Sequence, residues 1–168
     1  KIPEIQTAGG QPSEQRPARA LPYAINANAR QVKRDLLIDL TNTGSKAAVF
    51  TIHDYAPYNL TGPWRYTLDA GQSHAAAHWN HRDREVYDLA VHGPNGFYRH
   101  FTGRLRDDDR LMADPVLVVA SENAQNGELT LALQNTGNAA IEVSLVSDPR
   151  YSQSARTLTL PANGVETV

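Results

Sequence analysis

Three histidines lie close together in the chain, at His74, His78 and His81. Imidazole nitrogens are common zinc ligands, and on a helix this spacing would bring the rings together. The surrounding sequence has the pattern of a strand and a turn, so that His74 and His78 share a face while His81 points away. No carboxylate that would orient the rings is evident. We therefore interpret them as solvated histidines of an edge strand and predict no metal site.

The other reactive residue types give no stronger signal. The run Asp107–Asp109 resembles a solvated linker more than a calcium loop, because such loops space their oxygen ligands along a turn with glycine. Serines such as Ser45, Ser73 and Ser121 lack the G-x-S-x-G context of a nucleophile. There is no cysteine, which excludes disulfides and thiolate chemistry. Three more histidines are interpreted as isolated surface or hairpin residues: His53, His92 and His100. We predict no catalytic residue, no metal and no cofactor.

The loop Tyr55–Tyr66, YAPYNLTGPWRY, is the best candidate for a binding site. Its rings could stack on a quaternary ammonium group, and tyrosine and tryptophan also favour the membrane interface. In the alternative interpretation, the tryptophan and the last tyrosine cover one end of the domain while the other tyrosines fill out the loop. The predicted contacts to lipid or choline are Tyr55, Tyr58, Trp64 and Tyr66.

Charge and hydropathy exclude two classes of partner or location. The net charge is −2 and the 16 basic residues are scattered, so we predict no nucleic-acid partner. No apolar run approaches the ~18 residues of a membrane-spanning helix. The chain begins at Lys1 without a signal-peptide pattern, which is consistent with a piece of a longer protein.

Alternation with a period of two predicts an all-β fold. The segment Arg34–Asn42 puts three apolar residues on one face, and Tyr87–Gly103 reads as two strands around a Pro-Asn-Gly turn. Seven short strands with regular turn signals favour a β-sandwich. Tyr87 is either the residue of a tyrosine corner or an ordinary half-buried ring.

The sequence repeats itself at an offset of 93. Asn42-Thr43-Gly44 falls on Asn135-Thr136-Gly137, and a gapless alignment also pairs Ala27 with Ala120 and Leu36 with Leu129. The counterpart of the hairpin Tyr87–Gly103 is absent from the second copy. We therefore predict tandem Ig-like or fibronectin-like β-sandwich repeats, the second truncated. The predicted boundaries are a flexible Pro/Gly-rich linker at 1–19, a first repeat at 20–106, an acidic linker at 107–112 and an incomplete second repeat at 113–168.

Four motifs together resemble the C-terminal repeat domain of bacterial phosphocholine-type phospholipases C, haemolytic and non-haemolytic. They are Arg16–Tyr23, Leu40–Gly44, Trp79 and Tyr87–Gly103. In that family a hydrolase domain similar to acid phosphatases precedes two copies of this small domain. The resemblance implies exported enzymes that split phosphatidylcholine or sphingomyelin. That hydrolase domain has no counterpart in this sequence, so no catalytic residue can be carried over.

The resemblance implies a non-catalytic accessory region of a secreted phospholipase C, periplasmic or extracellular. The implied partners are the catalytic phosphoesterase domain of the parent chain and a choline-lipid membrane surface. Two alternatives stay open. The chain could be an autonomous binding module of the adhesin or carbohydrate-binding kind. It could also have a structural or assembly role, with another chain completing the open second repeat by strand addition.

Overall fold

The computed structural model shows an all-β chain of antiparallel sheets, as the sequence predicts. It describes residues 21–32, 35–56, 62–80, 86–104, 115–123, 125–151 and 153–168. Within these residues there are twelve strands and one short 3-10 helix. No helix of the described part of the chain is long and apolar enough to cross a membrane.

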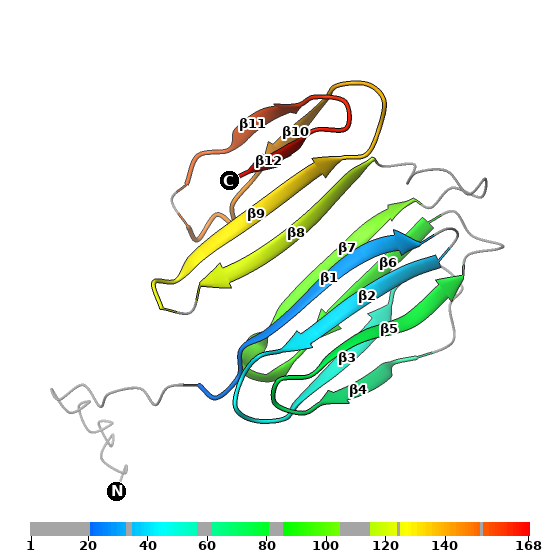
Figure 1. The fold of residues 1–168 in the computed structure, drawn as a ribbon, viewed down its shortest axis with the longest axis vertical. Helices are drawn as coiled ribbons and strands as arrows, with labels where there is room; N and C mark the ends of the chain where they lie inside the picture. Colours follow the sequence, from blue (N-terminus) through cyan, green and yellow to red (C-terminus); the bar gives the residue numbers. More distant parts are fainter. Residues whose placement is uncertain are drawn as a thin grey trace, which may run out of the picture.

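The first half of the chain forms two antiparallel sheets that lie against each other as layers (Figure 1). One sheet has the strand order β1-β2-β5: β1 (Ile25–Val32), β2 (Asp35–Asn42) and β5 (Ser73–Asn80). The other has the order β4-β3-β6-β7: β4 (Trp64–Leu68), β3 (Ala48–Asp54), β6 (Val86–His92) and β7 (Tyr98–Arg104).

The core of this half lies between the two layers. Alternate residues of each strand point inward, as the period of two requires. The largest fully buried apolar side chains of this half come from three strands: Leu36, Ile38 and Leu40 of β2, Phe50 and Ile52 of β3, and Leu89 and Val91 of β6. Burying a leucine, isoleucine, valine or phenylalanine stabilises a fold by about 1.5–3 kcal/mol, so this cluster carries much of the stability of the first half.

The predicted hairpin is present as β6, the 3-10 turn η1 (Pro94–Gly96) and β7. Asn95 and Gly96 both have positive φ, at 57° and 78°, which asparagine and glycine tolerate best. Across the hairpin, Tyr87 faces Gly103, and its buried ring occupies the space where a β-carbon at that position would lie. Residues 81–85 lie outside the described part of the chain, so the tyrosine corner stays a prediction.

The second half is smaller and also forms two sheets, drawn in yellow to red in Figure 1. One has the order β12-β9-β8: β12 (Val165–Thr167), β9 (Glu128–Asn135) and β8 (Val116–Asn123). The other pairs β10 (Ile141–Leu145) with β11 (Arg156–Leu160).

Each half has a buried asparagine at the same structural corner. The Asn42 amide donates to the carbonyls of Lys46 at 2.8 Å, Leu68 at 3.1 Å and Asp69 at 3.2 Å. Asn135 donates in the same way to three carbonyls: Ala139 at 2.8 Å, Leu160 at 3.2 Å and Pro161 at 3.0 Å. In both corners the side-chain oxygen accepts a bond from the glycine two residues later. The repeated Asn-Thr-Gly motif therefore builds the same corner twice.

The gapless alignment of the first strands was wrong. Ala27 pairs with Leu40 in the first half, whereas Leu133, at the position equivalent to Leu40, pairs with Val118 and not with Ala120. The offset is therefore 93 for β2 and β9 but 91 for β1 and β8. The physical reason is the hairpin loop, which is two residues longer between β8 and β9 than between β1 and β2.

The two halves meet where strand β1 faces strand β8 (Figure 1). Asn26 donates to the Ala120 carbonyl at 2.6 Å, and the Ala120 amide donates to the Asn28 side chain at 3.1 Å. Arg99 donates to the same Asn28 oxygen at 3.3 Å. Burial lowers the pKa of Arg99, and attraction to Glu122 opposes that shift. Side chains, and not a continuous strand ladder, thus join the two halves.

Candidate interaction surface

The structure separates the described members of the aromatic set predicted to contact lipid. Trp64 and Tyr66 lie on β4 and pack, partly buried, against the core of the first half. The Tyr66 ring lies 5.4 Å from that of His74. Tyr55 is 56% exposed, and Tyr58 lies outside the described residues. Only Tyr55 of the three described rings is thus largely available to a partner.

The interpretation of His53, His92 and His100 as isolated was wrong. Their strands β3, β6 and β7 are neighbours in one sheet, and all three rings project from its outer face. The rings of His53 and His92 lie 5.2 Å apart, nearly perpendicular to each other. Residues separated by 39 positions in sequence are therefore in contact through strand pairing.

The strand register places nine residues of this face in three rows of three, with Ala90 at the centre. In the middle row, Ala90 lies between His53 and His100. The row on one side contains Thr51, His92 and Tyr98. The row on the other side contains Tyr55, Asp88 and Thr102, with the Tyr55 amide donating to the Asp88 carbonyl at 2.8 Å. Ala90 is buried although it points outward, so the larger side chains around it form the surface.

Rings follow one another across this face without a break. The centroid of Tyr55 lies 6.0 Å from that of His53. From His92 the series continues to Tyr98 at 5.0 Å, and from Tyr98 to His100 at 6.1 Å. We use the name ring face for this surface, which consists of Ala90 and six residues around it: His53, Tyr55, Asp88, His92, Tyr98 and His100.

The ring face contains few charged side chains. Asp88 is its carboxylate, and an Asp88 oxygen lies 2.6 Å from Nε2 of His100. None of the nine residues in the three rows is lysine or arginine. The nearest basic residues in the register are Arg65, which pairs with Thr51, and Arg104 at the end of β7. The ring face can therefore offer a cation both aromatic rings and a carboxylate.

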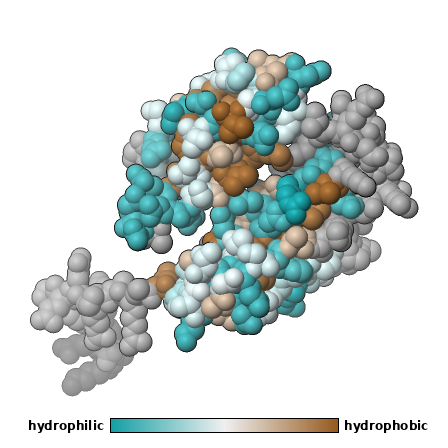
Figure 2. Space-filling view, viewed as in Figure 1, coloured by the Kyte–Doolittle hydropathy of each residue, from teal (hydrophilic) through white to brown (hydrophobic). Residues whose placement is uncertain are grey.

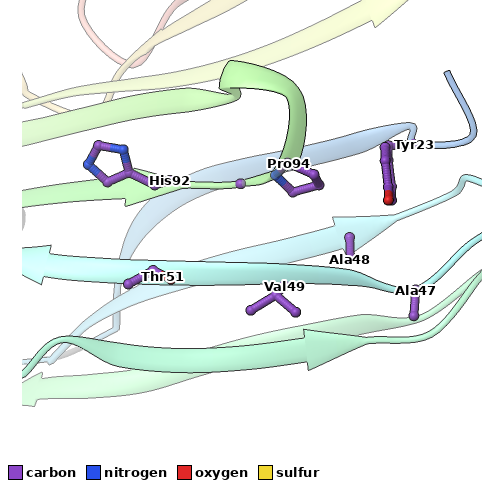
Figure 3. A pocket seen from close by; sticks show the side chains of 8 residues that line it. Tyr23, Ala47, Ala48, Val49, Thr51, His92 and Pro94 are labelled. Carbon is purple, nitrogen blue, oxygen red and sulfur yellow. The ribbon is translucent and has the colours of Figure 1, made fainter.

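A shallow groove of about 360 Å³ adjoins the ring face at His92. As Figure 3 shows, residues of β3, of the β6–β7 turn and of the segment before β1 surround it. Its lining is mainly apolar and includes Ala47, Val49 and Pro94, with Tyr23 at the side away from His92. The groove thus extends the ring face with an apolar surface.

Sequence reasoning missed Tyr98 and the gathering of the histidines. One signal was available, because the Pro-Asn-Gly turn fixes the pairing of His92 with Tyr98. The contact of His53 with His92 depends on the pairing of β3 with β6, which no local motif specifies.

No group of three or more histidine, aspartate or glutamate residues that could hold a metal ion occurs among the described residues. Of the group His74, His78 and His81, the side chain of His78 and the whole of His81 lie outside the described residues.

The chain belongs to the family of C-terminal domains of bacterial phospholipase C. Residues 17–104 match the family described as the C-terminal domain of bacterial phospholipase C. The resemblance found in the sequence motifs is thereby confirmed.

Three curated relatives extend this match over most of the chain. A non-hemolytic phospholipase C of Burkholderia pseudomallei is 34% identical over 148 residues, covering 86% of this chain and 21% of the relative. The non-hemolytic phospholipase C of Pseudomonas aeruginosa is 34% identical and covers 96% and 23%, respectively. The hemolytic phospholipase C of that organism is 28% identical, covering 89% and 23%. The chain thus spans roughly a fifth to a quarter of the length of these relatives.

Proposed function

We propose that this chain is the non-catalytic C-terminal accessory region of an exported bacterial phospholipase C, and that it helps the enzyme dock on lipid surfaces. The observation that carries the proposal is the match of residues 17–104 to the C-terminal domain of that family. The parent enzyme hydrolyses phosphatidylcholine or sphingomyelin through a catalytic phosphoesterase domain that lies outside this chain. The parent is secreted, to the periplasm or the extracellular space.

The structure supports a docking role through the exposed part of the first half. Tyr55 and Tyr98 present aromatic side chains to solvent on one face of a sheet, next to an apolar groove. Aromatic residues with one apolar and one polar end suit the boundary between lipid and water. Trp64 and Tyr66, in contrast, contribute mainly to packing in this proposal.

The organisation proposed from the sequence fits this role. A linker at 1–19 precedes a sandwich at 20–106, and a junction at 107–112 leads to a second, incomplete sandwich at 113–168. The matching corners at Asn42 and Asn135 support descent of both halves from one repeated unit.

Deleting this region from the parent enzyme tests the proposal. We expect hydrolysis of phosphatidylcholine vesicles to fall about tenfold or more, since docking concentrates the enzyme at its substrate. Hydrolysis of a soluble phosphocholine ester should stay within about twofold, because no catalytic group is removed. An equal loss on both substrates would overturn docking and would point to packing on the catalytic domain.

An assembly role is the second candidate, and the second half supports it. Among the described residues, β10 pairs only with β11, whereas β3 of the first half pairs with both β4 and β6. A free edge of this kind can accept a strand from another segment. If assembly is the role, sedimentation of the chain will show association that depends on concentration, and a strict monomer would exclude self-association.

A further inference from the structure

We propose that the ring face binds a quaternary ammonium group, the cationic part of a choline headgroup. This inference rests on the proposed function, since it names the chemical group through which docking on lipid would occur. It concerns Tyr98 and three histidines on β3, β6 and β7, as well as Tyr55 of the loop predicted to bind lipid.

The first argument is the arrangement of the rings. The five rings lie around Ala90, and because this residue is small and covered, the rings and not the backbone form the contact surface. His53 and His92 stand nearly perpendicular, at 85°, so their ring planes form a corner. Rings at an angle can contact one methyl-covered cation from two sides, which is how aromatic cages recognise quaternary ammonium groups.

The second argument is charge complementarity. Asp88 contributes a carboxylate to the ring face, and the three rows around Ala90 contain no lysine or arginine. The side chain of Asp88 is only partly covered, so a ligand can approach the carboxylate. A positive charge would be attracted both by Asp88 and by the negative faces of the tyrosine rings. A phosphate alone would find no fixed cation within this set of residues.

The third argument distinguishes a quaternary ammonium group from a primary amine. A primary ammonium has three N–H donors, which require oxygen acceptors around them. The ring face consists mainly of aromatic rings, with Asp88 as its single carboxylate and His100 already beside that carboxylate. Methyl groups need no acceptor, so the trimethylammonium group is the better match.

Titration of the 168-residue chain, followed by NMR of the tyrosine and histidine rings, tests this inference. The probes are choline chloride and 3,3-dimethylbutan-1-ol, which has the same shape without the charge. We expect choline to shift the ring signals of His92, Tyr98 and His100 with a Kd on the order of 10 mM, since exposed cation–π contacts are weak. The neutral alcohol should bind about fivefold more weakly. Equal binding of both probes, or no shift with choline, would overturn the inference.

Two tyrosine variants locate the contact. Tyr98→Ala removes an exposed ring of the ring face, so choline binding should weaken about fivefold. Tyr151→Ala is the matched control, since Tyr151 is an exposed tyrosine of the second half, and this variant should bind as the unchanged chain does. If Tyr98→Ala binds choline normally, the site does not lie on the ring face.

Flotation with phosphatidylcholine vesicles separates this inference from the proposed function. If the chain floats but Tyr98→Ala floats equally well, docking stands and the ring-face assignment is wrong. If choline shifts the ring signals but the chain does not float, the ammonium site stands and lipid docking by the isolated chain is wrong. Flotation that Tyr98→Ala abolishes and Tyr151→Ala retains supports both.

Discussion

The two halves of the chain build the same corner but bury very different amounts of apolar surface. At the corner the asparagine bonds of Asn42 and Asn135 match one for one. Farther along the same strands the halves diverge. Leu36 is 0% exposed, whereas its counterpart Leu129 is 55% exposed. Both halves therefore form the corner with the same side-chain bonds, while burial depends on strands that come later in the chain.

The strands that make the difference are β6 and β7. In the first half they complete the sheet that covers β2, and Leu89 and Val91 of β6 belong to the buried core. The described residues of the second half contain no pair of strands in that place. Several apolar side chains of the second half are exposed: Val118, Val119, Leu129 and Val165. Figure 2 shows brown, hydrophobic patches on the surface of this half.

The largest effect should come from leucines at equivalent positions. Leu36→Ala should lower the free energy of unfolding by about 3 kcal/mol, because it leaves a cavity in a closed core. Leu129→Ala should change it by less than about 0.5 kcal/mol, since much of that side chain is already in water. Urea denaturation followed by circular dichroism measures both. A large cost for Leu129→Ala would mean that its face is covered in solution.

The two corner asparagines should give similar, intermediate effects. Asn42→Ala and Asn135→Ala each leave three carbonyls without their side-chain donor, one of them buried and two partly buried, so each should cost about 2 kcal/mol. Hydrogen exchange of the corner amides measures the effect in each half separately. Gln134→Ala, at an exposed neighbouring position, is the control. Unequal costs would show that the corner is not independent of the core around it.

Gly103→Ala should destabilise the first half by about 1–2 kcal/mol, because a methyl group there would overpack the core. The new β-carbon would lie 2.7 Å from Cζ of Tyr87, which forces that ring to move. Tryptophan fluorescence during urea unfolding follows this half, since both tryptophans belong to it. Thr102→Ala, at an exposed position one residue earlier, should leave the free energy of unfolding nearly unchanged. If Gly103→Ala also left the free energy of unfolding unchanged, the ring of Tyr87 would have room to move.

The smallest effect should come from the exposed ion pair of Arg30 and Asp39. The two side chains lie 2.5 Å apart, and the bond to Asp39 raises the pKa of Arg30. Both groups are well exposed, so Arg30→Gln should cost no more than about 0.5 kcal/mol. Because salt screens exposed charges, repeating the urea titration in about 1 M NaCl should remove the difference. A difference that persisted in high salt would come from packing of the arginine stem.

Local patterns in the sequence were enough to predict much of the fold. The alternation of Leu36, Ile38 and Leu40 predicted a buried strand face, and the turn at Asn95 and Gly96 predicted the hairpin. The repeated Asn-Thr-Gly motif predicted equivalent positions, which the hydrogen bonds of the two corners match. The strand face and the turn depend on neighbours in sequence. The corner could be predicted from the repetition of its motif, although its bonds reach the distant carbonyls of Leu68 and Leu160.

Non-local pairing explains what the sequence did not reveal. His53 meets His92 only because β3 pairs with β6, with a loop and two strands between them. The alignment of Ala27 with Ala120 looked sound because both are alanines, but a hairpin longer by two residues shifts the true partner to Val118. The choline contacts proposed from Tyr55–Tyr66 treated the loop as one unit, whereas β4 turns Trp64 and Tyr66 toward the core.

The junction at Ala120 has a consequence for solubility. Strands β1 and β8 are edge strands of their sheets, and exposed edges can template the pairing of one molecule with another. In the middle of β8, Asn26 donates to the carbonyl of Ala120, and Asn28 accepts a bond from the amide of Ala120. Each half thus shields a vulnerable edge of the other from intermolecular β-pairing, the first step of aggregation.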